Sequence, residues 1–130
     1  MLRAHLATRG NEVVVPTPRL LKHWCGRLNH ELFGGQLPMP RSIKPCSVPN
    51  WMACAVFEYG DRASWDLQFV EMPMPRKHML EVLAHELVHA AVYLLDKQSI
   101  TAATGHGTQF MTYKSLLEDH GLTLKDGFYG

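Results

Sequence analysis

The segment from Met79 to Leu95 is a long apolar run that contains the polar pattern His85-Glu86-Leu87-Val88-His89. Apolar residues on most sides of a helix predict a core helix, and we expect this one to begin at Arg76. Residues four apart lie on one helical face, so the two imidazoles can reach the same metal ion. Burying two histidines and a glutamate is costly unless they are paired or bind a metal. The pattern therefore predicts a metal site on a buried helix.

The residue types in this pattern are those of zinc hydrolases. Zinc binds imidazole nitrogen at ~2.0–2.1 Å and prefers a tetrahedral shell, so His85 and His89 are candidate zinc ligands. Glu86 can face the open position and act as the general base toward a zinc-bound water, as in metalloproteases. The alternative interpretation is a pair of hydrogen-bonded core histidines beside a solvated glutamate.

A catalytic zinc usually has three protein ligands, so a third ligand is needed. Asp96 faces the same side as His89 but lies two turns, or ~10 Å, further along, which excludes it unless the helix breaks first. His106, between two glycines at the start of a predicted helix, is the best candidate, because glycine lets backbone approach a metal closely. The alternatives are that His106 is an ordinary loop histidine, or that the Glu118–His120 cluster supplies the ligand, although its charges are more typical of a solvated helix end.

Two tyrosines are candidate donors to the oxyanion of a hydrolytic reaction. Tyr93 lies one turn after His89 on the same face, and Tyr113 lies on the helix that follows His106. A phenol in either place can stabilise developing negative charge. Aromatic residues on helices more often belong to the core, which is the competing interpretation.

Before the motif, the sequence predicts one helix and a few strands. Thr17-Pro18 is typical of a helix start, and Gly34-Gly35 ends that helix. Residues 42–47 form a possible short strand in a proline-rich stretch. Residues 51–58 and 65–71 are expected to be two strands that pair antiparallel across a short turn.

The two ends of the chain differ in pattern. Residues 1–16 show little periodicity and are expected to form an arm, with a possible short strand at residues 13–15, while residues 17–130 form the domain. After Leu95 the chain is polar to Thr104. A third helix is then expected through Phe110 and Leu117, ending at Gly121.

Composition narrows the class of function. At 130 residues the chain has the length of one domain. Its thirteen basic and twelve acidic residues give a net charge of +1, which argues against a dedicated nucleic-acid adaptor and predicts weak DNA binding by this chain alone. No apolar run reaches membrane-spanning length, the N-terminus lacks the apolar core of a signal peptide, and the three cysteines do not suggest a disulfide framework. We therefore expect a cytoplasmic protein without membrane contacts.

Three segments, in order, resemble the SprT-like (Spartan-type) zinc metallopeptidase family. Residues 29–38, Asn-His-Glu-Leu-Phe-Gly-Gly-Gln-Leu-Pro, resemble the end of the family's first helix. Residues 85–90, His-Glu-Leu-Val-His-Ala, resemble its metal motif, and residues 105–110, Gly-His-Gly-Thr-Gln-Phe, resemble its third-ligand segment. The joint occurrence is more specific than His-Glu-x-x-His alone. The chain resembles a minimal form of the family without a zinc ribbon.

The resemblance implies a compact zincin-like α+β domain, in which a small antiparallel sheet packs against an N-terminal helix and the motif helix, with a third C-terminal helix. It also implies Zn²⁺ on His85, His89 and His106, with Glu86 as the base that activates a zinc-bound water to hydrolyse a protein or peptide substrate. The alternative function is a zinc-binding structural or interaction module of a larger assembly, without turnover.

Overall fold

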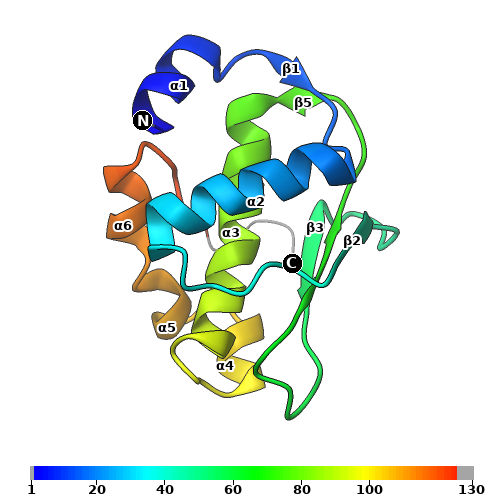
Figure 1. The fold of residues 1–130 in the computed structure, drawn as a ribbon, viewed down its shortest axis with the longest axis vertical. Coiled ribbons are helices and arrows are strands. Elements are labelled where there is room, and N and C mark those ends of the chain that lie inside the picture. The colour runs from blue at the N-terminus through cyan, green and yellow to red at the C-terminus, as the bar shows by residue number, and fades with distance from the viewer. Residues whose placement is uncertain (1, 126–130) are drawn as a thin grey trace.

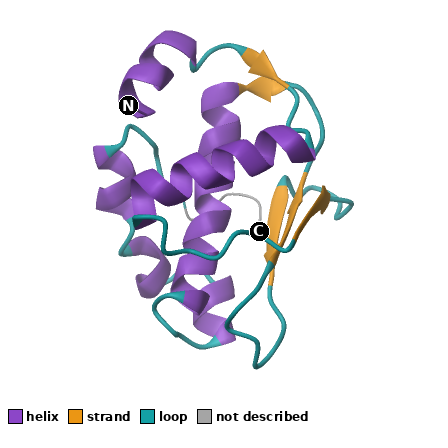
Figure 2. Cartoon of the chain, viewed as in Figure 1, coloured by secondary structure: helices purple, strands orange, loops and turns teal. Residues whose placement is uncertain are grey.

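Helix α3 (Arg76–Leu94) runs through the middle of the molecule, and the other elements pack around it (Figure 1). The computed structural model describes residues 2–125. Every residue from Met79 to Leu94 is buried, as the apolar run predicts. The remaining elements are α1 (Leu2–Arg9), β1 (Val13–Val14), α2 (Pro18–Phe33), β2 (Ser42–Pro45), β3 (Ala53–Val56), β4 (Asp66–Phe69), β5 (Met74–Pro75), α4 (Ile100–Thr104), α5 (Thr108–Met111) and α6 (Lys114–Asp119). Helices and sheets occupy separate regions, so the expected α+β class is confirmed (Figure 2).

Helix α2 crosses α3 and covers one side of it (Figure 1). The expected start and stop are both confirmed: the Thr17 hydroxyl accepts a hydrogen bond from the Leu20 amide, and Gly34 adopts a left-handed conformation with φ of 61°. The buried Asn29 side chain then bonds both the amide and the carbonyl of Leu37, at 3.0 and 2.7 Å. These contacts turn the chain back toward β2.

The larger sheet has the strand order β2-β4-β3. Strands β3 and β4 pair antiparallel, as expected from their short connection. The expectation of an entirely antiparallel sheet is wrong, because β2 pairs parallel with β4. The physical reason is that β4 inserts between β2 and β3, so it runs against the strand that precedes it directly and along the earlier one. A short connection favours antiparallel pairing of two consecutive strands, and within this sheet only β3 and β4 are both consecutive in the chain and adjacent.

The expected N-terminal arm has regular structure. Residues 2–9 form α1, whose Leu2 is buried, and this helix contacts α3. The possible strand is confirmed at residues 13–14, where β1 pairs antiparallel with β5. Residue 1 and residues 126–130, the outer ends of the two expected segments, lie outside the described residues.

The region after α3 also differs from expectation. The polar stretch contains α4, whose first turn is capped by the Ser99 hydroxyl. The single third helix that was expected is instead divided into α5 and α6. At the break, the Tyr113 ring packs edge-on against Phe33 at 5.8 Å and its hydroxyl donates to Asp96 at 2.7 Å. These two contacts fix Tyr113 at the junction between α5 and α6, where one continuous helix was expected. Among the described residues, no helix combines the length and apolarity needed to cross a membrane.

Candidate metal centre

The imidazoles of His85 and His89 lie one turn apart on α3, and the structure brings His106 against both of them. Each pair of Nε2 atoms is separated by 3.2 Å. Within residues 2–125, these three side chains are the only group of potential metal ligands. Three imidazole nitrogens at such short range can share a cation at their centre. The expected third position, His106, thus lies beside the first two, whereas Asp96 and the Glu118–His120 cluster do not.

The spacing can be compared with what a metal ion requires. In a tetrahedron the edge is about 1.63 times the distance from centre to corner, so an edge of 3.2 Å corresponds to metal–nitrogen bonds of ~2.0 Å. That length lies in the range of imidazole bonds to a transition metal. The three histidines therefore fit a metal ion with one position left open.

The ring of His89 is oriented by a backbone group on α4. Its Nδ1 lies 2.6 Å from the carbonyl oxygen of Ala103, which can only accept a hydrogen bond. Nδ1 must then carry the proton, and the lone pair of Nε2 faces the other two histidines. Such a partner fixes the tautomer that a metal requires and raises the basicity of the ligand.

Phe110 forms a hydrophobic wall shared by the three histidines. Its fully buried ring has its centroid 4.8, 4.6 and 5.0 Å from those of His85, His89 and His106. His106 itself sits in the short loop between α4 and α5 and is only half-buried. Packing on Phe110 restricts that loop, so the third imidazole is held although it is not on a long helix.

Glu86 is a buried carboxylate whose two oxygens differ in their hydrogen bonding. Its Oε1 accepts a hydrogen bond of 2.9 Å from the Ala55 amide on β3. Its Oε2 lies 4.0 Å from His85 Nε2 and has no hydrogen-bond partner among the described residues. Burial raises the pKa of Glu86 well above its usual range, and the Ala55 amide opposes that shift. The side chain is thus positioned to hold or release a proton next to the histidines.

The two tyrosines are not brought to the histidine cluster by any contact in the described residues. Tyr93 donates to the Glu58 carbonyl at 3.2 Å, and the Arg62 guanidinium lies 4.2 Å from its ring centre. Tyr113 donates to Asp96, and its pKa is raised by burial and by that carboxylate. Both hydroxyls have structural partners, which makes the oxyanion role a weaker interpretation than the core role.

A small pocket of about 130 Å³ borders the cluster at His89. It lies between β3 and α4, and its walls are mainly apolar. Its other lining residues are Trp51, Cys54, Ala55, Phe57 and Thr104. The pocket provides a place for one medium-sized apolar group next to the candidate metal centre.

Two functional groups at this centre escaped sequence reasoning: the Ala55 amide and the Ala103 carbonyl. Both belong to the backbone, and alanine gives no signal that its main chain will contact a functional side chain. The two backbone groups are identified only from the structure, in which β3 packs against α3 and α4 lies beside His89.

No family model, no curated protein and no solved structure matches this chain.

Proposed function

We propose that this chain is a zinc-dependent peptidase of the SprT-like, zincin type. The observation that carries the proposal is the combination of three histidine nitrogens with a buried glutamate, Glu86, whose Oε2 has no hydrogen-bond partner among the described residues and lies 4.0 Å from His85 Nε2. A structural zinc site normally has four protein ligands, whereas a catalytic site has three and an open position. Within residues 2–125 the cluster has three.

Zinc is the metal favoured by the donor set and by the spacing. The bond length of ~2.0 Å that a tetrahedral shell requires here agrees with zinc–imidazole bonds of ~2.0–2.1 Å. An octahedral shell with the same edge would require ~2.3 Å, which suits larger oxygen-preferring ions that rarely choose three imidazoles. When bound, zinc would supply a Lewis acid that polarises a carbonyl and lowers the pKa of a water molecule.

The protein's own residues then account for proton transfer and positioning. The Ala55 amide fixes one oxygen of Glu86, so the other oxygen is directed to take the proton of the attacking water. Glu86 then passes that proton to the leaving amine. The apolar pocket at His89 binds a side chain next to the scissile bond, which predicts a preference for an apolar residue there.

A second function, a zinc-binding structural or interaction module within a larger assembly, is favoured by a different observation. His85 and Glu86 have no exposed surface and His89 is 2% exposed, so access to the centre is limited to His106 and the small pocket. A closed centre of this kind suits a metal that stabilises the fold.

Cleavage of a denatured protein separates the two functions. The purified chain is incubated with the denatured protein after metal removal by a chelator, and again after zinc is restored. The peptidase function predicts fragments only with zinc. A folded, zinc-loaded protein that leaves every denatured substrate intact would support the module instead.

A further inference from the structure

Arg62, on the connection between β3 and β4, is a half-buried cation without a carboxylate partner among the described residues. Its Nη1 donates to the carbonyl of Tyr93 at 2.9 Å and also to the carbonyl of Gln98. The guanidinium carbon lies 4.2 Å from the centre of the Tyr93 ring. These contacts fix the position of the positive charge, but none of them neutralises it.

The edge of this guanidinium that carries Nε and Nη2 remains available. Nη1 uses both of its N–H groups on the carbonyls of Tyr93 and Gln98. Within residues 2–125, neither Nε nor Nη2 of Arg62 belongs to the buried polar atoms that lack a partner, so both remain accessible to a ligand. Their N–H groups form a fork that can bind both oxygens of one carboxylate.

Arg62 lines a hollow of about 340 Å³ between the turn that follows β3 and the beginning of α4. The other lining residues of this Arg62 hollow are Tyr59, Gly60, Tyr93, Ser99, Ile100 and Thr101. They supply aromatic rings and hydroxyl groups, and none of them is acidic. The hollow therefore combines a fixed cation with neutral walls, which suits a ligand that carries one negative charge.

The carboxylates closest to Arg62 in the sequence are already engaged. Asp61 accepts hydrogen bonds from the Ala63 amide at 2.8 Å and from the Ser64 hydroxyl at 2.7 Å. Glu58 pairs with Arg41 at 3.3 Å. The protein's own acidic groups thus leave the positive charge in the hollow to a ligand.

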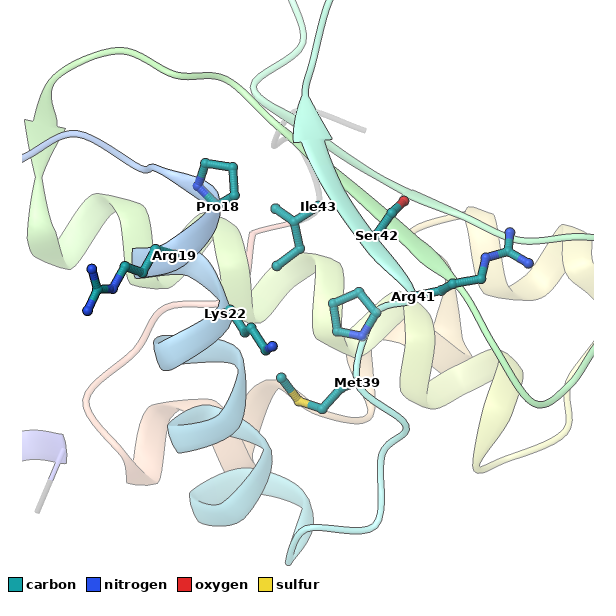
Figure 3. Close-up of a pocket in the computed structure, with 8 residues that line it drawn as sticks. Pro18, Arg19, Lys22, Met39, Arg41, Ser42 and Ile43 are labelled. Carbon is teal, nitrogen blue, oxygen red and sulfur yellow. The ribbon is translucent and has the colours of Figure 1, made fainter.

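A second hollow, of about 370 Å³ between α2 and β2, provides a contrast (Figure 3). Arg19 and Arg41 line it, but both guanidinium groups point away from it, and Arg41 is paired with Asp66 at 2.6 Å (Figure 3). Lys22 points into it, but no hydrogen bond within residues 2–125 fixes the ammonium group. The Arg62 hollow is the one that offers a cation fixed in place.

The Arg62 hollow adjoins the small pocket at His89. Tyr93 lines the hollow and Phe57 lines the pocket, and the centroids of their rings lie 4.9 Å apart. Helix α4 borders both spaces, and it lies beside the connection between β3 and β4 (Figure 1). A peptide that places an apolar side chain next to His89 can therefore extend between this connection and α4 as far as Arg62.

We propose that the Arg62 hollow binds a carboxylate of the peptide whose apolar side chain occupies the pocket at His89. The carboxylate accepts hydrogen bonds from Nε and Nη2 of Arg62, and it belongs to an acidic side chain or to the C-terminus of the peptide. Because Arg62 is held in place before the ligand arrives, little ordering is needed on binding. The identity of the ligand as a peptide rests on the proposed peptidase function.

The probes are three kinds of N-acetylated peptide that begin with valine, each made with one and with two glycines before the last residue. The first ends in glutamate amide, the second in glutamine with a free C-terminus, and the third in glutamine amide, which has no carboxylate. Binding to the metal-free protein is followed by amide NMR shifts in the presence of a chelator. We expect at least one acidic peptide to bind at least about tenfold more tightly than its neutral counterpart, with shifts at Arg62 and Thr101.

Two variants test the contact by different routes. Arg62→Gln removes the fork, and Thr101→Glu leaves Arg62 intact but places a competing carboxylate in the hollow. Glutamate is compatible with the first turn of α4, because negative charge is favourable there. Each variant should abolish the advantage of the acidic peptide. Arg19→Gln and Thr8→Glu, at exposed positions on α2 and α1, are the matched controls and should keep it.

Equal binding of the acidic and neutral peptides, or an advantage that survives in folded Thr101→Glu and Arg62→Gln, would overturn the proposal. Tighter binding of inorganic phosphate than of either acidic peptide would also overturn it, because the hollow would then be a phosphate site. The acidic peptide that binds identifies the source of the carboxylate. Because binding is measured without metal, a zinc-loaded protein that binds the acidic peptide but cleaves no substrate would support the hollow and refute the peptidase function alone.

Discussion

The buried carboxylate of Glu86 accepts a 2.9 Å hydrogen bond from the backbone amide of Ala55, which ties the middle of α3 to β3. The sheet therefore does more than cover the helix. It sets the direction of an acidic side chain whose other oxygen lies 4.0 Å from His85 Nε2.

The third ligand is tested by replacing His106 with alanine. We expect about one zinc per wild-type chain and the loss of most of it in the variant, because two histidines on one helix leave the ion with too few protein ligands. His30→Ala is the matched control, since His30 is exposed on α2. Elemental analysis of the purified proteins gives the answer. Normal zinc in His106→Ala would exclude His106 as a ligand.

Phe110→Ala should destabilise the fold and weaken the metal site together. The ring is fully buried and contacts all three imidazoles, so its removal leaves a cavity and is expected to cost about 3–5 kcal/mol of unfolding free energy. Phe110→Leu should lose less. Chemical denaturation with and without zinc measures both effects, and a stabilisation by zinc equal to that of the wild type would argue against a role for the ring in holding His106.

Asp66 should contribute stability that disappears in acid. Hydrogen bonds from Arg41 and Ser42 lower its pKa, so the folded state favours the carboxylate. A lowered pKa gives stability that is present above the ordinary value near 3.8 and is lost as pH falls through the lowered value. At neutral pH, Asp66→Asn should lose about 1 kcal/mol, because the pair is partly exposed.

The Asp66 experiment is read from thermal denaturation at several pH values. The wild type and Asp66→Asn should differ at pH 7 and converge in strong acid. Asp119→Asn, at an exposed position on α6, is the control. A difference that persists unchanged in strong acid would mean that the carboxylate charge is not responsible.

DNA binding by this chain alone should be weak and steeply dependent on salt. Four basic residues, Arg41, Lys44, Arg76 and Lys77, are candidates for contacts with phosphates, but Arg41 is paired with Asp66, and Arg76 is paired with Glu12 and its side chain is only 12% exposed. Few cations then remain for phosphates, which predicts a dissociation constant near ~10⁻⁴ M at physiological salt. Titration of labelled single- and double-stranded DNA at two salt concentrations measures this. Submicromolar affinity at physiological salt would contradict it.

The sequence predicted those elements whose boundaries have strong local causes. Thr17-Pro18 and Gly34 define α2, and the apolar run defines α3, because capping and burial leave few alternatives. The sequence did not predict α1, because the apolar residues of this segment show weak periodicity. Packing of α1 on α3 supplies the stability of the helix. The sequence also missed the insertion of β4 beside β2, since parallel pairing between distant strands leaves no local signal.

The candidate site was predictable for side chains but not for backbone groups. The spacing of His85 and His89 requires only a helix, and His106 was reached because one more ligand was needed. The tyrosines illustrate the limit of helical spacing: Tyr93 is on the expected helix, yet its hydroxyl contacts Glu58 on the connection after β3. The spacing of residues along a helix predicts the face on which a side chain lies. Its contacts depend on the neighbouring helices, strands and loops.

The central claim, that Glu86 is the base of a zinc peptidase, is tested most directly by Glu86→Gln. The amide has nearly the same size but cannot accept a proton, so zinc content and fold should be retained while hydrolysis of a denatured protein falls by about 10²–10⁴-fold. Zinc content and cleavage rate are measured on the same preparations. Loss of cleavage at full zinc occupancy is the predicted result, whereas unchanged cleavage by Glu86→Gln would contradict the mechanism.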